Sequence, residues 1–211
     1  MKKVAVIGAN GQAGARIVDE ALRQGYAVTA VVRNKEYKND KAGVIYKDIM
    51  SLEKADLAGF DAVITAFGTW SDETRHLHTD GLLHVADLLS GTDTRLLVVG
   101  GAGSLYVDDA LSVRLIDTPE FPAEYKPTAN AMAQGLDELR KRDDVKWTYL
   151  SPAAEFEVDM PRTGEYIVAG EKFTLNEKGE SVISYADYAI AMVDEIKNEK
   201  FIQKRFSVLG K

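Results

Sequence analysis

Residues 4–14 read VAVIGANGQAG. The stretch begins as a short apolar run and then places glycines at Gly8, Gly11 and Gly14. An amphipathic pattern typical of a helix follows over about Gln12–Gln24. Strand, glycine-rich turn and helix in that order indicate a dinucleotide-binding fold, although three glycines are also compatible with a plain structural turn.

Each glycine has a different expected role. Gly8 lets the chain leave the strand sharply, Gly11 removes a Cβ where the backbone approaches a pyrophosphate, and Gly14 lets the helix pack close to the strand. The N–H groups at the start of the helix would bind the phosphates. The residues expected to form this phosphate site are Gly8, Asn10, Gly11, Gln12 and Ala13.

Strand patterns alternate with helix patterns along the chain. The strand candidates are Val4–Gly8, Ala27–Val32, Val44–Tyr46, Ala62–Ala66, Leu96–Val99, Trp147–Leu150 and Phe206–Leu209. The helix candidates are Gln12–Gln24, Leu77–Leu89, Ala129–Lys141 and Tyr185–Asn198. Nearly continuous apolar runs are typical of parallel strands that are covered on both faces. We predict an α/β protein with a doubly wound, Rossmann-type parallel sheet, in one domain spanning residues 1–211.

The regular alternation stops after the sixth strand. Residues 151–184 are rich in turn residues and are expected to form a small C-terminal region on the substrate side. Within it, Tyr166–Val168 and Lys172–Leu175 are predicted to form a hairpin around Ala169 and Gly170. Ser184 is predicted to cap the last helix.

Composition excludes several classes of function. The 33 acidic residues outnumber the 26 lysines and arginines among 211, and the net charge of −7 argues against nucleic-acid binding. The absence of cysteine excludes disulfides and thiolate chemistry, and with three histidines we expect no metal site. No apolar run approaches the length of a membrane span, so we expect a cytoplasmic protein that binds neither membrane nor nucleic acid. The oligomeric state stays open.

The end of the second strand bears on cofactor choice. The chain continues there with Arg33, Asn34 and Lys35, and the first carboxylate is Glu36. A carboxylate at this strand end would bind the ribose 2′-hydroxyl, whereas an arginine suits a 2′-phosphate, to which Lys35 would add a nearby charge. NADP(H) is therefore favoured, with NAD(H) as the alternative. Arg33 could also be a solvated loop residue.

Other strand ends should meet at the same crevice. Asp48 could hydrogen bond to the adenine or cap the next turn, and Ile49 could pack against the adenine. The remaining cofactor-binding candidates near strand ends are Ala66, Phe67, Gly68, Gly101 and Pro152.

The segments GANGQAG, VVRN, AFG, RLLVVGGAGSL, LSPA and SYADYAIAMVDEI follow one another in this order. The chain thereby resembles the atypical short-chain dehydrogenase/reductases with a single NAD(P)H-binding domain, in the NADH-flavin reductase-like branch related to biliverdin reductase B. The resemblance spans nearly the whole chain and implies a Rossmann fold with a nicotinamide cofactor. It also places Ser104 at the family's active-site serine, where capping of the following turn is the alternative role.

Two departures from the family limit the chemistry. Members that act on alcohols or sugars use a Tyr-x-x-x-Lys pair, in which the lysine lowers the pKa of the tyrosine. Here Tyr125 is followed four residues later by Ala129, and Tyr106 by Ala110. Biliverdin reductase B also has a histidine after its sixth strand, where this chain reads Pro152-Ala153-Ala154, which speaks against a bilin substrate.

Hydride transfer to a flavin, a quinone or a similar conjugated acceptor makes fewer demands, because a stacked geometry and one or two hydrogen-bond donors suffice. The catalytic candidates are Ser104 and Tyr125, and the substrate-binding candidates are Trp70, Tyr106 and Phe156, with Phe67 as a further wall. Each of these aromatics taken singly is more typical of core or surface packing than of a substrate wall, and Trp70, in a polar loop, is the best wall candidate. His76 and His78 are expected to be solvated residues at a helix end.

The sequence thus favours an NADPH-dependent oxidoreductase that reduces a small conjugated molecule. Two alternatives remain at this point. One is a non-catalytic NADP(H)-binding redox sensor, and the other is an epimerase- or dehydratase-like enzyme acting on a nucleotide sugar. The lack of a lysine four residues after Tyr106 or Tyr125 weighs against the latter.

Overall fold

In the computed structural model, which describes residues 1–33 and 36–211, an eight-stranded sheet forms the centre of the fold. The strand order is β3-β2-β1-β4-β5-β6-β10-β8. All neighbouring strands are parallel except β8, which pairs antiparallel with β10 at one edge. The strands of this sheet are β1 (Lys3–Ile7), β2 (Ala27–Val32), β3 (Gly43–Tyr46), β4 (Ala62–Thr65), β5 (Arg95–Val99), β6 (Lys146–Ser151), β8 (Ile167–Ala169) and β10 (Lys204–Leu209).

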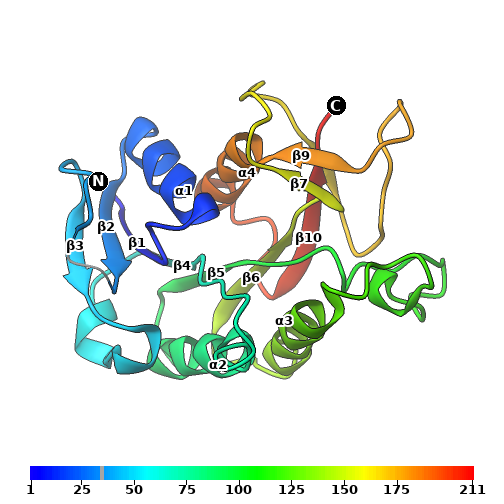
Figure 1. The fold of residues 1–211 in the computed structure, drawn as a ribbon. Helices are drawn as coiled ribbons and strands as arrows, with labels where there is room; N and C mark the ends of the chain where they lie inside the picture. The colour runs from blue at the N-terminus through cyan, green and yellow to red at the C-terminus, as the bar shows by residue number, and fades with distance from the viewer. Residues whose placement is uncertain (34–35) are drawn as a thin grey trace.

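Helices cover both faces of the sheet, with α1 and α4 above it and α2 and α3 below it in the view of Figure 1. Their bounds are α1 (Gln12–Arg23), α2 (Leu77–Leu89), α3 (Lys126–Leu139) and α4 (Tyr185–Asn198), with short 3₁₀ turns η1 (Ile49–Ser51), η2 (Lys54–Leu57) and η3 (Leu115–Asp117). Val4 and Val6 pack in the layer of α1 and α4, whereas Ala5 and Ile7 pack in the layer of α2 and α3. Burial on both faces explains the continuous apolar runs and confirms the doubly wound α/β fold.

The topology fixes where a ligand would bind. From β1 the chain builds outward through β2 and β3 and then returns to β4 on the other side of β1. The chain leaves β1 toward one side of the sheet and leaves β4 toward the other. A crevice therefore forms between the carboxyl ends of β1 and β4. Gly8 follows β1 and Ala66 follows β4, so the glycine turn lies at this point.

The hairpin predicted after Tyr166 is wrong. Ile167–Ala169 does form a strand, β8, but it pairs with β10, where Val168 lies opposite Val208. Residues 172–175 form no strand, and Lys172 instead makes an isolated bridge with Tyr106. The edge of β10 provides the backbone hydrogen-bond partners of β8. These replace the partners that a hairpin around Gly170 would have provided. In the same region β7 (Glu155–Glu157) and β9 (Val182–Ser184) form a separate parallel pair.

The helix boundaries are close to those expected. Ser184 caps α4 as predicted, because its Oγ accepts a hydrogen bond from the Asp187 amide at 2.9 Å. Helix α3 begins at Lys126, before the expected Ala129, since Pro127 is well suited to a first helical turn. Within the described residues, no helix has the length and apolar character required to cross a membrane.

Candidate functional site

The three glycines of the first turn have unequal packing roles. Gly8 has a φ of +76°, and a Cβ there would lie 2.7 Å from the carbonyl oxygen of Ala66. A Cβ on Gly14 would lie 2.2 Å from the carbonyl oxygen of Gly8, so α1 could not start this close to the turn. A Cβ on Gly11 would meet only that same oxygen, at 3.3 Å. The fold therefore requires Gly8 and Gly14, while Gly11 leaves space on the outer side of the turn.

The start of α1 fits a phosphate. Gly11 is the N-cap residue, and within the described part of the chain no side chain caps the helix there and no acidic residue stands in its first turn. The guanidinium group of Arg16 donates a hydrogen bond to Oε1 of Gln12 at 2.8 Å, so the Gln12 side chain points along the helix. Asn10 is exposed and Ala13 is half-buried at the same turn. Backbone N–H groups and the helix dipole can thus receive a pyrophosphate without displacing a side chain.

Arg33 and Asp48 lie together beyond the ends of β2 and β3. The Arg33 side chain is 73% exposed, and its Nη1 lies 3.9 Å from Oδ2 of Asp48. The other Asp48 oxygen accepts a hydrogen bond from the Met50 amide at 3.0 Å, so Asp48 caps η1. An adenine contact of Asp48 stays a prediction. Asn34 and Lys35 lie outside the described residues.

Ile49 is buried, and its Cδ1 lies 3.0 Å from the position that a Cβ on Gly81 of α2 would take. Its side chain therefore packs inside the protein beneath α2. Packing of Ile49 against an adenine stays a prediction.

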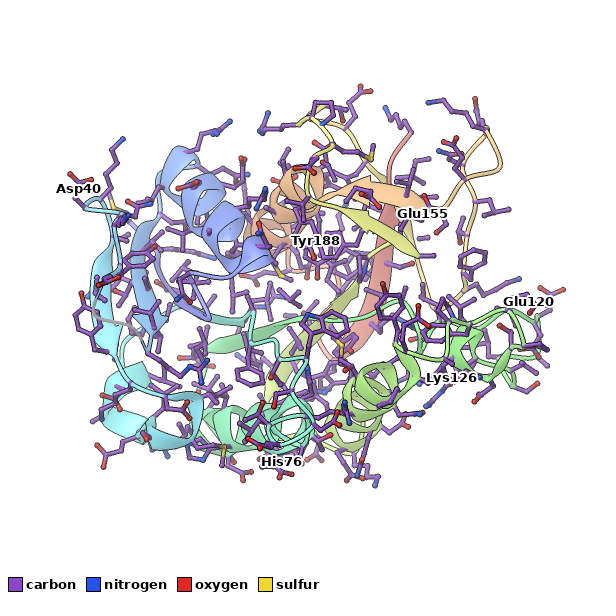
Figure 2. The ribbon with its side chains drawn as sticks, in the orientation of Figure 1. Asp40, His76, Glu120, Lys126, Glu155 and Tyr188 are labelled. Carbon is purple, nitrogen blue, oxygen red and sulfur yellow. The ribbon has the colours of Figure 1, made fainter. Side chains whose placement is uncertain are left out.

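A hollow lies between the carboxyl ends of β4 and β5, the start of α2 and the middle of α3. It is lined by Thr65, Phe67, Leu77, His78, Leu82, Val98, Val99, Met132 and Tyr149. Figure 2 marks the two helix starts, with His76 just before α2 and Lys126 at the first residue of α3. Ala66 and Gly68 flank Phe67 in the loop that leaves β4.

His78 is not the solvated residue expected from the sequence. Its Nε2 lies 2.9 Å from the Thr69 carbonyl oxygen, and its ring meets the Phe67 ring edge-on with centroids 5.6 Å apart. Burial lowers the pKa of the His78 imidazole below its usual 6.5. A neutral ring therefore holds the loop after β4, whereas His76 is exposed as expected.

Two exposed aromatic rings meet at the same edge of the sheet. Trp70, in the loop after β4, is 71% exposed, and Tyr125, just before α3, is 49% exposed. Their ring centroids lie 5.8 Å apart with the planes tilted by 60°. A largely exposed tryptophan gains little from packing, so this pair offers a surface on which a flat ring can stack.

The other predicted wall residues have partners within the protein. Phe156 of β7 stacks on Tyr185 at 3.6 Å between ring centroids, which accounts for its packing. The ring of Tyr106 lies against two guanidinium groups, those of Arg114 and Arg205, each 5.9 Å from its centroid.

Ser104 and Pro152 are buried near the ends of β5 and β6. The Ser104 Oγ lies 3.4 Å from Nη1 of Arg205, a residue of β10. Gly101 donates its amide to the Tyr149 hydroxyl at 3.3 Å. A Cβ on Gly100 would lie 2.1 Å from the Tyr149 ring, which explains the glycine at this position.

Sequence reasoning missed Tyr149, Arg205 and Glu171, which support the loop after β5. Burial raises the pKa of Tyr149 to about 12, so its phenol stays protonated. Arg205 ion pairs with Glu171 at 2.5 Å. A signal existed for Arg205, because this arginine directly precedes the predicted strand Phe206–Leu209, and an arginine in a strand is rarely buried without a partner.

The chain belongs to the NAD(P)H-binding family, whose model matches residues 8–199. The Bacillus subtilis (strain 168) protein YwnB is 45% identical over 210 residues, which cover 99% of this chain and 98% of YwnB. A solved structure from Streptococcus pneumoniae TIGR4, described as that of a proposed NADH-flavin reductase, is 53% identical with a TM-score of 0.97, covering 100% of both chains. A proposed epimerase from Bacteroides thetaiotaomicron is 36% identical with a TM-score of 0.87, covering 99% of this chain and 96% of its own.

Proposed function

We propose that this protein is an NADPH-dependent reductase that transfers a hydride to a flavin, a quinone or a similar conjugated acceptor. The observation that carries the proposal is the exposed pair Trp70 and Tyr125, which lies at the same edge of the sheet as the glycine turn. Family membership and the name of the Streptococcus pneumoniae relative support the same reaction class. The absence of a Tyr-x-x-x-Lys pair at Tyr125 and Tyr106 argues against epimerase chemistry.

The residues of the candidate site have three proposed roles. The turn around Gly11 and the start of α1 bind the pyrophosphate, and Arg33 contacts the 2′-phosphate. Trp70 stacks on the acceptor, and the Tyr125 ring, tilted by 60° from that of Trp70, packs against the acceptor's edge. Together they orient the acceptor and exclude water from one of its faces. NADPH held by these residues would supply a hydride to the acceptor, and a proton from water would neutralise the negative charge left on the reduced acceptor. Ser104 donates a hydrogen bond toward that charge.

The test is NADPH oxidation measured at 340 nm with FMN and with menadione as acceptors. Trp70→Ala should raise KM for the acceptor about tenfold, because base–aromatic stacking contributes roughly 1–3 kcal/mol per ring. Tyr125→Phe, the matched control, keeps the ring and loses only the hydroxyl. Its activity should stay within about tenfold of the unmodified protein, well below the 10² to 10⁴ expected for a lost general acid.

Three outcomes would count against the proposal. An unchanged acceptor KM in Trp70→Ala would remove the stacking role. A near-complete loss of turnover in Tyr125→Phe would indicate tyrosine acid–base chemistry. Binding of NADPH without turnover of either acceptor would favour the redox sensor.

A further inference from the structure

Arg205 of β10 carries a buried positive charge, and the three roles proposed for the site do not involve it. Its side chain is 0% exposed, whereas its ion-pair partner Glu171 is 33% exposed. A charge removed from water is costly unless it is paired and fully hydrogen bonded. The contacts that offset this cost lie around the loop after β5.

Arg205 contacts two serines that follow or end neighbouring strands. Its Nη1 lies 3.4 Å from the Ser104 Oγ and 3.3 Å from the Ser151 Oγ, while its Nη2 donates to the Ser104 carbonyl oxygen at 3.2 Å. A guanidinium group can only donate hydrogen bonds, so each hydroxyl oxygen acts as acceptor. The hydroxyl proton of Ser104 must therefore point away from Arg205, and it is left to donate to another group.

The charges around Arg205 leave a positive surplus. Glu171 is shared, because Arg140 of α3 ion pairs with the same carboxylate oxygen at 2.6 Å. Two guanidinium groups and one carboxylate sum to +1. The Tyr106 ring also faces Arg205, and it carries Arg114 as well, whose charge is balanced by its ion pair with Asp137. Burial raises the pKa of Tyr149, so its phenol adds no charge. A buried positive charge next to Ser104 favours negative charge on whatever the serine contacts.

We propose that Arg205 is a positioning residue: it orients the Ser104 hydroxyl as a donor and supplies the positive field that stabilises the negative charge left on the reduced acceptor. The inference rests on the proposed function. It assigns to the site a preference for flat acceptors that become oxyanions on reduction, such as quinones. Arg205 need not touch the acceptor, since it acts through Ser104.

The test uses 4-nitrophenol, a flat ring whose neutral and ionised forms absorb differently, titrated into the full-length protein with saturating NADP⁺. The unmodified protein should bind the phenolate more tightly than the phenol. Ser104→Ala and Arg205→Lys should each reduce this preference by about tenfold or more, because a single oxyanion donor can contribute 10²-fold or more to binding of developing charge. The Arg205→Lys variant keeps the positive charge but loses the planar guanidinium group that contacts both Ser104 and Ser151. NADP⁺ affinity should stay unchanged in both variants.

Two comparisons separate positioning from a structural role. In the double variant Ser104→Ala/Arg205→Lys the loss should not exceed that of either single variant, because both changes remove the same donor. Arg95→Lys is the matched control, since Arg95 is the other buried arginine with a glutamate partner, Glu195, and it lies at the amino end of β5. It should lower the midpoint of thermal unfolding while leaving the phenolate preference intact.

Each result bears on the inference whether or not the protein turns over. No phenolate preference in the unmodified protein, a preference retained in both Arg205→Lys and Arg205→Met, or an equal loss in Arg95→Lys would overturn it. NADPH oxidation is measured on the same samples. Its absence would overturn the proposed reductase, while the phenolate titration would still decide the role of Arg205.

Discussion

Arg95 and Arg205, the buried arginines of the described chain, each pair with a glutamate, and they lie at different levels of the same sheet. Arg95 begins β5 and pairs with Glu195 of α4 at 2.8 Å, with side chains only 5% and 3% exposed. Arg205 lies further along the parallel strands, opposite Tyr149 of β6, and pairs with the part-exposed Glu171. Thr148 accepts a hydrogen bond from Arg95, whereas Ser104 and Ser151 accept from Arg205.

The difference separates groups that hold the fold from groups that organise the candidate site. Arg95 donates to atoms of β6 and α4, so its hydrogen bonds join regular elements. Arg205 donates to Ser104, in the loop at the carboxyl side of β5, and to Glu171, which follows the antiparallel edge strand β8. Loops at that side carry ligand sites in parallel sheets. We therefore expect changes at the amino ends to affect stability and changes at the carboxyl ends to affect binding.

The largest expected effect is on stability at the amino end. Arg95→Met should lower the free energy of unfolding by about 3–5 kcal/mol, because Glu195 would stay buried without a counter-charge. Arg205→Met should cost less, since Glu171 keeps Arg140 and contacts solvent. Urea unfolding followed by circular dichroism measures both. A larger loss of unfolding free energy in Arg205→Met than in Arg95→Met would contradict the difference drawn between the two arginines.

The next effect concerns the glycine turn. Gly11→Ala should weaken NADPH binding by about 1.5–3 kcal/mol, because its Cβ would hold the pyrophosphate away from the backbone N–H groups and cost one hydrogen bond to a charged group. Its effect on stability should be smaller than that of Gly14→Ala, since the added Cβ would meet only the Gly8 carbonyl oxygen, at 3.3 Å. Gly14→Ala is the contrast, because its Cβ would lie 2.2 Å from the Gly8 carbonyl oxygen and must disturb the start of α1. Calorimetric titration and thermal unfolding of both variants test the two roles. Normal NADPH affinity in Gly11→Ala would show that the phosphates lie elsewhere.

A smaller effect is expected at Arg33. Because this side chain is 73% exposed, its contact with a 2′-phosphate should be screened to about 1 kcal/mol, roughly fivefold in affinity. Arg33→Ala should therefore lower NADPH affinity by that factor and leave NADH affinity unchanged. Equal calorimetric affinities for the two nucleotides in the unmodified protein would contradict the assignment.

The smallest effect is the pH dependence contributed by His78. Burial lowers the pKa of this imidazole in the folded protein, so the unfolded chain binds the proton more readily. The stabilising contribution is therefore present above about pH 6.5 and is lost as the pH falls below it. Between pH 7.5 and 5.5 the unmodified protein should lose more stability than His78→Asn. Equal losses would mean that His78 titrates as a solvated residue.

Local sequence determined the layers of the fold and the first turn of the site. Short apolar runs predicted the strands, and the spacing of Gly8, Gly11 and Gly14 predicted a strand, turn and helix in the right order. These features depend on neighbours within about ten residues, whose conformations are set by backbone sterics and by burial of one stripe or both faces. The predicted Ser184 cap was correct for the same reason.

The tertiary structure alone decided which side chains support the loop after β5. Arg205 and Ser104 are 101 residues apart in the chain, and Arg205 and Glu171 are 34 apart. Strand β10 comes last in the chain but lies beside β6, so no local pattern shows that they meet. The predicted hairpin failed in the same way, because the edge of β10 competed for Ile167–Ala169. Pairing between distant strands depends on the crossovers of the whole sheet, and only the folded chain specifies them.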